Sequence, residues 1–478
     1  ESLRPGDVLI TNNPWQTSGH LHDFTVMTPV FRRQDSVLVG FFGNTCHVLD
    51  IGGRGFGTDA QSVFEEGLHV PITKLYDGGR ENEELFKLIA ANVRTPEPVL
   101  GDIHAQVSAN DVGGSRLLEF LDEFGLDSID PLGDEIISRS ERAMRQAIST
   151  VPDGVYAHEI YSDGYDAPVR LRATITKRGD ELAVDWSGSS PESSRGINVV
   201  LNYTHAYTTY ALKCMLAPEV PNNEGSFRPV MVTAPPGCIL NAQPPAPVGG
   251  RHVLGHFLPL VVMGALAGVL PSRVMAEGAA NIWSLQFSGR YDDGQPWTYV
   301  WFSSGGTGAR PDADGLSTTA FPSGIAGVPV EVIESLAPIV IRERELTTDS
   351  GGPGRFRGGC GQQMRVVVRT GHPFTLSPLF DRVHFAAAGM AGGLPGGPAS
   401  IEASDGTRFD TKGARTFAPG VEITLRLPGG GGFFDPKTRE PERVIDDIVD
   451  GLVSVDAARR DFGLAGDTPV SSLNGNCT

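Results

Sequence analysis

The sequence lacks the usual signs of a disulfide-stabilised or membrane-spanning protein. It has only five cysteines, widely scattered and without a CxxC pair, which is typical of reduced thiols in a cytoplasmic protein. They are Cys46, Cys214, Cys238, Cys360 and Cys477. The longest apolar stretch, residues 257–270, is too short to span a bilayer and predicts a buried helix. No signal peptide is recognisable at Glu1, and we expect the sequence to begin partway through a longer protein.

Two motifs of nucleotide and acyl-transfer chemistry are also missing. The dipeptide Gly-Lys does not occur, so the sequence has no Walker A loop, and GxSxG is absent, so a nucleophile elbow has no candidate. Any nucleotide chemistry therefore requires another subunit or an unfamiliar site. A formal net charge of −18 argues against nucleic acid as the main partner and suits a protein that handles small molecules.

Glycine and proline, in contrast, are abundant. The 478 residues include 60 glycines and 35 prolines without a G-X-Y period, which predicts many tight turns and short strands. This length exceeds one ordinary core, so we expect several domains. The sequence predicts a multi-domain α+β protein, rich in strands and glycine turns. The expected domains are a metal-binding α+β domain (1–150), a central mixed α/β domain (151–330) and a glycine-rich β domain with a C-terminal helix (331–478).

Hydrophobic periodicity locates the elements that matter for the site. Residues 24–31 and 37–42 are β-branched and aromatic runs separated by a polar turn, and they predict a hairpin. Helical spacing in 84–93, 115–124 and 134–148 predicts a helical segment near residues 82–150. Near the C-terminus, a helix at 441–450 is expected to continue into 455–461, after glycine turns at 351–354 and 429–432.

The most informative pattern combines two histidines and an aspartate. His20 and Asp23 lie in Gly-His-Leu-His-Asp before the first strand of the hairpin, and His47 follows the second strand. The ends of a hairpin lie side by side, so these three side chains would converge on one divalent ion, such as Zn²⁺, Mn²⁺ or Fe²⁺. Asp50 and His22 are candidates for orienting a ligand or transferring protons, with His22 expected to point away from His20. The alternative interpretation is a polar loop with surface histidines.

A second group of candidates surrounds the apolar stretch at 257–270. Arg251 and His252 are candidates for binding the substrate, with Arg251 holding an anionic group, and Arg195 is a similar candidate from another loop. His252 and His256 are four residues apart and would share one face of a helix, but no glutamate accompanies them as in HExxH. A helix start that enters a core explains the same residues equally well.

Long ordered motifs also make the sequence resemble the hydantoinase B/oxoprolinase family along essentially its whole length. The resemblance is carried by GDVLITNNP (6–14), GHLHD (19–23), CHVLDIGG (46–53), NVRTP (92–96), GDIHAQ (101–106), PNNEG (221–225), DSGGPGRFRGG (349–359), PGGGG (428–432) and DGLVS (450–454). Many relatives have Asn-Asp-Pro at 12–14 and a His-His pair at 47–48, where this sequence has Asn13 and Val48. Relatives also carry a leading segment, which would supply any further ligands.

The resemblance implies a B-type subunit of an ATP-dependent cyclic amide hydrolase, as in hydantoinases, N-methylhydantoinases and 5-oxoprolinases. It implies an A-type partner that binds ATP and Mg²⁺ and phosphorylates the substrate, in a cytoplasmic hetero-oligomer such as (AB)2. It also implies one metal held by His20, Asp23 and His47, because the carboxylase branch carries such a site. The alternatives are a subunit of an acetone- or acetophenone-type carboxylase and a non-catalytic scaffold for the ATPase partner.

Overall fold

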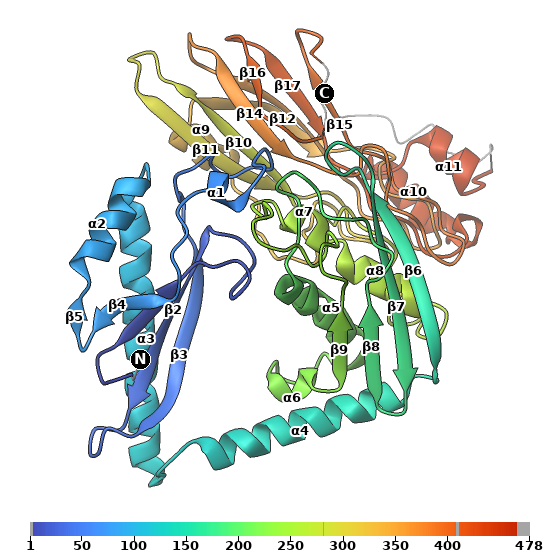
Figure 1. The fold of residues 1–478 in the computed structure, drawn as a ribbon. Coiled ribbons are helices and arrows are strands. Elements are labelled where there is room, and N and C mark those ends of the chain that lie inside the picture. Colours follow the sequence, from blue (N-terminus) through green and yellow to red (C-terminus); the bar gives the residue numbers. More distant parts are fainter. Residues whose placement is uncertain (1–2, 281, 408–410, 466–478) are drawn as a thin grey trace.

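The computed structural model describes residues 3–280, 282–407 and 411–465. Figure 1 shows three successive stretches of chain: a blue one beside a green one, and a yellow-to-red one across one end of both. Within the described residues, no helix has both the length and the apolar character that crossing a membrane requires.

The first stretch is a five-stranded sheet with two helices packed on it. The strand order is β3-β2-β1-β4-β5, and α3 lies on β2 and β3 with α2 beside it. The elements are β1 (Val8–Thr11), β2 (Asp23–Phe31), β3 (Leu38–His47), α1 (Val63–Glu66), β4 (Thr73–Asp77), β5 (Arg80–Glu81), α2 (Glu83–Asn92) and α3 (Pro96–Phe124). Its core holds Ile10, Phe24 and Ile103, all less than 2% exposed.

Helix α4 (Asp130–Ser149) leads from the first stretch to the second, along the lower edge in Figure 1. The second stretch is a four-stranded sheet of order β6-β7-β8-β9, in which β8 and β9 run parallel and α8 covers β6 and β7. Its elements are β6 (Gly154–Ser162), β7 (Val169–Arg178), β8 (Glu181–Asp185), α5 (Leu201–Leu216), α6 (Glu224–Phe227), β9 (Val230–Thr233), α7 (His252–Gly255) and α8 (Leu258–Leu266). Almost every residue of α8 is buried, which confirms the predicted buried helix.

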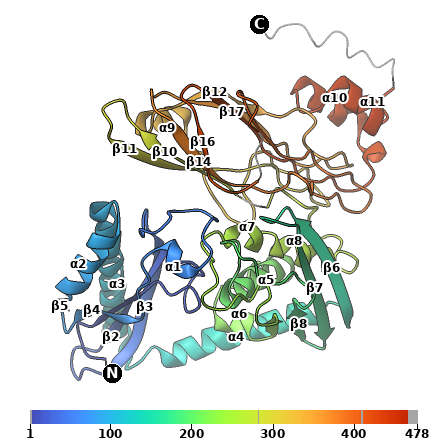
Figure 2. The ribbon, with the colours of Figure 1, turned by 45° about the horizontal axis from the view of Figure 1, so that its top comes forward.

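The third stretch contains two four-stranded sheets that share one hydrophobic core, and Figure 2 shows them above the other two stretches. Their orders are β11-β10-β14-β16 and β12-β13-β17-β15. The elements are β10 (Trp283–Arg290), β11 (Pro296–Ser303), α9 (Val330–Leu336), β12 (Ile339–Leu346), β13 (Gln362–Val368), β14 (Phe374–Leu379), β15 (Ser400–Ala403), β16 (Arg415–Phe417), β17 (Glu422–Arg426), η1 (Pro436–Thr438), α10 (Pro441–Val449) and α11 (Val455–Asp461). Strands β10 and β11 thus belong to the last sheets, although the sequence grouped them with residues 151–330.

Glycine-rich segments pack directly against one another inside this third stretch. The N–H of Gly352 donates to the carbonyl of Gly430 at 2.8 Å, and the N–H of Gly430 donates to the carbonyl of Gly359 at 2.9 Å. A Cβ atom at Gly430 would lie 1.9 Å from the carbonyl oxygen of Thr307, so no side chain fits there. Segments 351–354 and 429–432, expected as simple turns, are therefore largely buried and held by contacts between backbones.

Most sequence expectations for the elements are confirmed. The α+β class, the hairpin (β2 and β3) and the helical segment near residues 82–150 (α2, α3 and α4) are all present. The expected continuous C-terminal helix is wrong, because Gly451 has a φ of +71° and separates α10 from α11. Cys46, Cys214, Cys238 and Cys360 are free thiols, whereas Cys477 lies outside the described residues.

Candidate metal centre

The hairpin brings two of the predicted ligands together. Asp23 is the first residue of β2, His47 is the last residue of β3, and the two are paired directly across the strands. His20 approaches from the turn just before β2. Gly19, which precedes it, has a φ of +101°, and a Cβ atom there would lie 2.8 Å from Cδ of Arg251. Glycine at position 19 therefore allows the turn to deliver His20 to the ends of the hairpin.

The three side chains meet at one point. His20 Nε2 lies 2.7 Å from Asp23 Oδ1, His47 Nδ1 lies 3.0 Å from the same oxygen, and the two nitrogens are 3.2 Å apart. His20 and Asp23 are buried, while the His47 side chain is 45% exposed. The cluster is thus closed on the protein side and open on the side of His47.

This donor set fits a divalent metal ion. Metal–ligand bonds of about 2.0–2.2 Å in a tetrahedral site place donors roughly 3.4 Å apart, so a small outward movement of the three side chains accommodates an ion. Nδ1 of His20 lies 3.1 Å from the carbonyl oxygen of Gly249. A hydrogen on Nδ1 is donated to that carbonyl, which leaves a lone pair on Nε2 facing the Asp23 carboxylate. A cation between these two electron-rich atoms removes their repulsion.

The surroundings keep His20 and Asp23 in the protonation states that metal binding requires. Burial, reinforced by the charge of Arg251, lowers the pKa of His20 to about 4, so its imidazole is neutral near pH 7. Burial alone would raise the pKa of Asp23, but the neighbouring imidazoles of His20 and His47 and the positive charge of Arg251 lower it below its usual range. Neutral nitrogens and an ionised oxygen are the forms that bind divalent ions.

His22 lies on the same side as the cluster, contrary to the expected alternation. Residues 19–22 form turns rather than an extended segment, and the His22 ring centroid is 5.4 Å from that of His20 and 5.2 Å from that of His47. Its Nδ1 atom is buried and has no hydrogen-bond partner among the described residues. Burial, together with the charges of His20 and His47, holds the pKa of His22 well below its usual value.

Asp50 is engaged away from the cluster. Its carboxylate accepts hydrogen bonds from Nη1 of Arg94 at 2.6 Å and from the backbone N–H of Gly52 at 3.2 Å. It also accepts a very short hydrogen bond from the backbone N–H of Arg94. In this arrangement the carboxylate anchors the loop after β3 to the segment after α2, and it does not orient a ligand imidazole.

Arg251 contacts the cluster from behind rather than facing a substrate. Its Nη2 atom lies 2.7 Å from Asp23 Oδ2, its Nε atom donates to the Ser18 carbonyl at 2.7 Å, and its guanidinium lies 4.7 Å from the centre of the Tyr203 ring. Asp23 thus turns one oxygen toward the histidines and the other toward a cation.

His252 and His256 are also buried, and their ring centroids are 5.7 Å apart. His252 stacks on Phe56 at 5.6 Å, and His256 Nε2 is 2.9 Å from the hydroxyl of Ser323. His256 is the C-cap of α7, has helical backbone angles and donates its N–H to the His252 carbonyl at 3.2 Å, so the two rings lie one turn apart on the same side, as predicted. Neither histidine lines the cavity described next.

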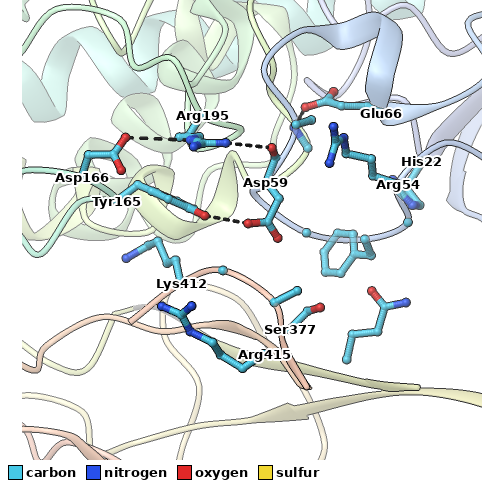
Figure 3. A pocket seen from close by; sticks show the side chains of 18 residues that line it. His22, Arg54, Asp59, Glu66, Tyr165, Asp166, Arg195, Ser377, Lys412 and Arg415 are labelled. Carbon is cyan, nitrogen blue, oxygen red and sulfur yellow. Dashed lines mark hydrogen bonds and ion pairs between the residues drawn. The ribbon is translucent and has the colours of Figure 1, made fainter. Parts of the chain in front are cut away.

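A cavity of about 680 Å³ lies beside the cluster and is lined by all three stretches of chain (Figure 3). The charged and polar side chains around it are His22, Arg54, Asp59, Glu66, Tyr165, Asp166, Arg195, Gln286, Ser377, Lys412 and Arg415. Tyr165 donates a hydrogen bond to Asp59 at 2.6 Å, which joins the first stretch to the second. Arg195, a sequence candidate, lines this cavity. A neighbouring cavity of about 800 Å³, which Asp50 helps to line, shares Arg54, Gly55, Phe56 and Gln286 with it.

The sequence did not predict that two of the lining residues, Phe56 and Glu66, belong to the site. The Phe56 ring is 5.2–6.2 Å from the rings of His20, His22 and His47 and meets each of them edge-on. Glu66 is only 3% exposed, and burial raises its pKa to about 7. Neither residue belongs to a local motif, because their partners in the site come from distant parts of the chain.

Together, the fold and the site define an α+β protein with a histidine–aspartate cluster beside a cavity between three stretches of chain. A family model described as hydantoinase B/oxoprolinase matches residues 1–436. The chain belongs to the hydantoinase B/oxoprolinase family, which confirms the resemblance in its motifs.

Individual relatives are similar over nearly the whole chain. The B-type subunit of a putative D-/L-hydantoinase from Pseudomonas sp. (strain NS671) is 32% identical, over 97% of this chain and 82% of that protein. The crystal structure of an ATP-dependent caprolactamase from Pseudomonas jessenii superposes with a TM-score of 0.89 at 28% identity, covering 99% of this chain and 85% of that chain. A nucleotide-free acetone carboxylase shares the fold, with a TM-score of 0.82 at 20% identity over 96% of this chain and 69% of that chain.

Proposed function

We propose that this chain is the metal-dependent subunit of an ATP-dependent cyclic amide hydrolase. It opens a ring, of the hydantoin, 5-oxoproline or lactam type, that an ATP-binding A-type partner has phosphorylated. The observation that carries the proposal is the cluster of His20, Asp23 and His47 beside a cavity, in a chain whose relatives include a putative hydantoinase and a caprolactamase. We place the complex, an (AB)2 hetero-oligomer or a similar assembly, in the cytoplasm.

The chemistry follows from the weak electrophilicity of amides. Resonance with nitrogen reduces the reactivity of the carbonyl carbon, and phosphorylation of the carbonyl oxygen by ATP and Mg²⁺ on the partner turns that oxygen into a leaving group. A divalent ion (Zn²⁺, Mn²⁺ or Fe²⁺) at the cluster would supply a nucleophilic water near neutral pH, because it lowers the pKa of water. Addition of this water to the phosphorylated carbon followed by cleavage of the carbon–nitrogen bond would open the ring, with the nitrogen taking up a proton and the carbon left as an acyl phosphate. A second water would hydrolyse the acyl phosphate to a carboxylate and inorganic phosphate.

The residues of this chain would bind the ion, carry a proton and orient the ligands. His20, Asp23 and His47 would hold the ion, and the exposed side of His47 leaves room for a reactant. His22 lines the cavity and has a free ring nitrogen, so it is the proposed proton carrier. Arg251 keeps Asp23 ionised and oriented. Arg251 and His252 are not proposed as contacts of the substrate, because Arg251 pairs with Asp23 and neither residue lines the cavity. Asp50 is not proposed for proton transfer, because its carboxylate is paired with Arg94.

The test uses the chain co-expressed with its ATP-binding partner. We expect the purified complex to contain about one divalent ion per chain and to couple ATP hydrolysis to ring opening of one cyclic amide class. His20→Ala and His47→Ala should lose both metal and ring opening. His69→Ala is the matched control because His69 is exposed. Full metal content and full activity in His20→Ala would refute the proposed site.

The same preparation separates the competing functions. Incorporation of labelled bicarbonate into product would identify a carboxylase, which shares this fold. A complex that opens the ring without metal at these residues would identify the chain as a scaffold whose partner performs the chemistry.

A further inference from the structure

Glu66, the last residue of α1, is connected to His20 of the cluster through a single residue, Gly249. Its Oε1 atom accepts a hydrogen bond from the backbone N–H of Gly249 at 2.6 Å. The carbonyl oxygen of the same glycine lies 3.1 Å from Nδ1 of His20. A carboxylate, a glycine and an imidazole thus form a continuous path that ends at the proposed ligand nitrogen.

The loop around Gly249 is shaped for this contact. A Cβ atom at Gly249 would lie 3.2 Å from Glu66 Oε1, and one at Gly196 would lie 3.4 Å from the same atom. The N–H of Gly250 donates to the carbonyl of Gly196 at 2.7 Å, which holds the two glycine segments together. Glycine at these positions allows two backbone segments to close around one buried carboxyl group.

A purely structural role explains this arrangement poorly. The Oε2 atom of Glu66 is buried and has no hydrogen-bond partner among the described residues. A buried polar atom without a partner costs stability, and an uncharged amide side chain would accept the Gly249 N–H without burying an ionisable group. Glu66 also lines the cavity beside the cluster (Figure 3), so the unfavourable burial of its Oε2 atom occurs at the proposed site.

We propose that Glu66 is a positioning residue for His20. By accepting the N–H of Gly249 it fixes the Gly249 carbonyl where this carbonyl receives the His20 Nδ1 hydrogen, and so it holds His20 Nε2 toward Asp23 and His47. Outer partners of this kind orient metal-binding histidines, and their loss weakens metal affinity by about 10- to 100-fold. The inference rests on the proposed function, because it concerns the ion that the cluster would hold.

The test measures metal affinity by chelator competition in the co-expressed complex. Glu66→Leu removes the acceptor and should weaken metal binding by about 10- to 100-fold, with KM for the amide unchanged and kcat restored by saturating metal. Glu66→Gln keeps an oxygen at the position of Oε1 and should bind metal within about threefold of the wild type. Glu65→Leu, next to Glu66 on the same helix, is the control and should leave metal affinity unchanged.

Each outcome decides the proposal. Unchanged metal affinity in a folded Glu66→Leu variant overturns it, and loss of ring opening in Glu66→Gln at saturating metal assigns proton transfer to Glu66 instead. If Glu66→Leu does not fold, Glu66→Asp decides, because its shorter side chain moves the acceptor away from Gly249 and should weaken metal binding. A wild type that binds no metal refutes the proposed function, whereas normal metal loss in His20→Ala with no effect at Glu66 refutes only this inference.

Discussion

At the scale of single residues, the site depends on the Asp23 carboxylate, which contacts different groups with its two oxygens. Asp23 faces the histidines with one oxygen and Arg251 with the other, and both side chains are about 10% exposed. Such a buried pair is sensitive to the loss of one partner, because the remaining charge has neither water nor a counter-ion.

Arg251→Met should therefore destabilise the protein strongly. We expect a loss of roughly 3–5 kcal/mol in the free energy of unfolding without metal, measured by urea unfolding with tryptophan fluorescence. Added divalent metal should recover part of this loss, because a cation at the cluster compensates Asp23. Arg116→Met is the control, since Arg116 forms an exposed ion pair on α3 and should change stability by less than about 1 kcal/mol. Equal effects of the two substitutions would contradict the buried pair.

Glu66 should make stability depend on pH. Burial raises its pKa from the ordinary 4.5 to about 7. The folded protein then binds a proton that the unfolded chain has lost, so the contribution of Glu66 is fully present below pH 4.5 and is lost as the pH rises through about 7. The loss amounts to roughly 3 kcal/mol at pH 8. As the pH rises from 5 to 8, the free energy of unfolding of Glu66→Gln should increase relative to that of the wild type. A difference between the two proteins that stays constant over this range would contradict the prediction.

At the scale of elements, α3 packs closely on the hairpin formed by β2 and β3. A Cβ atom at Gly113 of α3 would lie 2.5 Å from the Phe42 ring of β3, whereas one at Gly101 of the same helix would meet nothing within 4 Å. The helix therefore approaches the strands closely at one glycine and not at the other.

These two glycines give a matched pair of substitutions. Gly101→Ala should stabilise the protein by up to about 1 kcal/mol, because alanine favours the helix and meets open space. Gly113→Ala gains the same propensity but forces Phe42 to move, which typically costs about 1–3 kcal/mol, so a net loss of up to about 2 kcal/mol is expected. Thermal unfolding of both variants is the measurement. A similar gain in both would show that α3 does not press on the hairpin.

Local sequence patterns predict elements better than they predict contacts between them. His20, Asp23 and His47 were recognisable because two β runs with a polar turn imply that Asp23 and His47 are neighbours, as their pairing shows. Glu66 was not recognisable, because its contact with Gly249 spans 183 positions and belongs to no periodic pattern. The sequence also did not predict that Arg251 pairs with Asp23, because the two residues are 228 positions apart and belong to no common pattern.

At the scale of the whole molecule, the cavity exists only because three stretches of chain keep their relative positions. Ser377 of β14 and Arg415 of β16 line the cavity from the third stretch (Figure 3), which also contains the glycine segments 351–354 and 429–432 that pack against one another. The abundance of glycine thus supports the site from a distance, because it allows backbone segments to pack where side chains would keep them apart.

Gly430→Ala tests this dependence. Its Cβ atom would lie 1.9 Å from the carbonyl oxygen of Thr307 and 2.7 Å from the backbone nitrogen of Gly308, and both are backbone atoms of a buried segment that is hydrogen-bonded to Gly359. We expect a loss above about 4 kcal/mol, seen as a collapse of soluble yield or a large fall in the melting temperature. Gly324→Ala, where a Cβ atom meets nothing within 4 Å, should behave as the wild type. Normal stability and normal ring opening in Gly430→Ala would contradict the prediction. They would show that the glycine segments are loosely packed and do not hold the cavity in place.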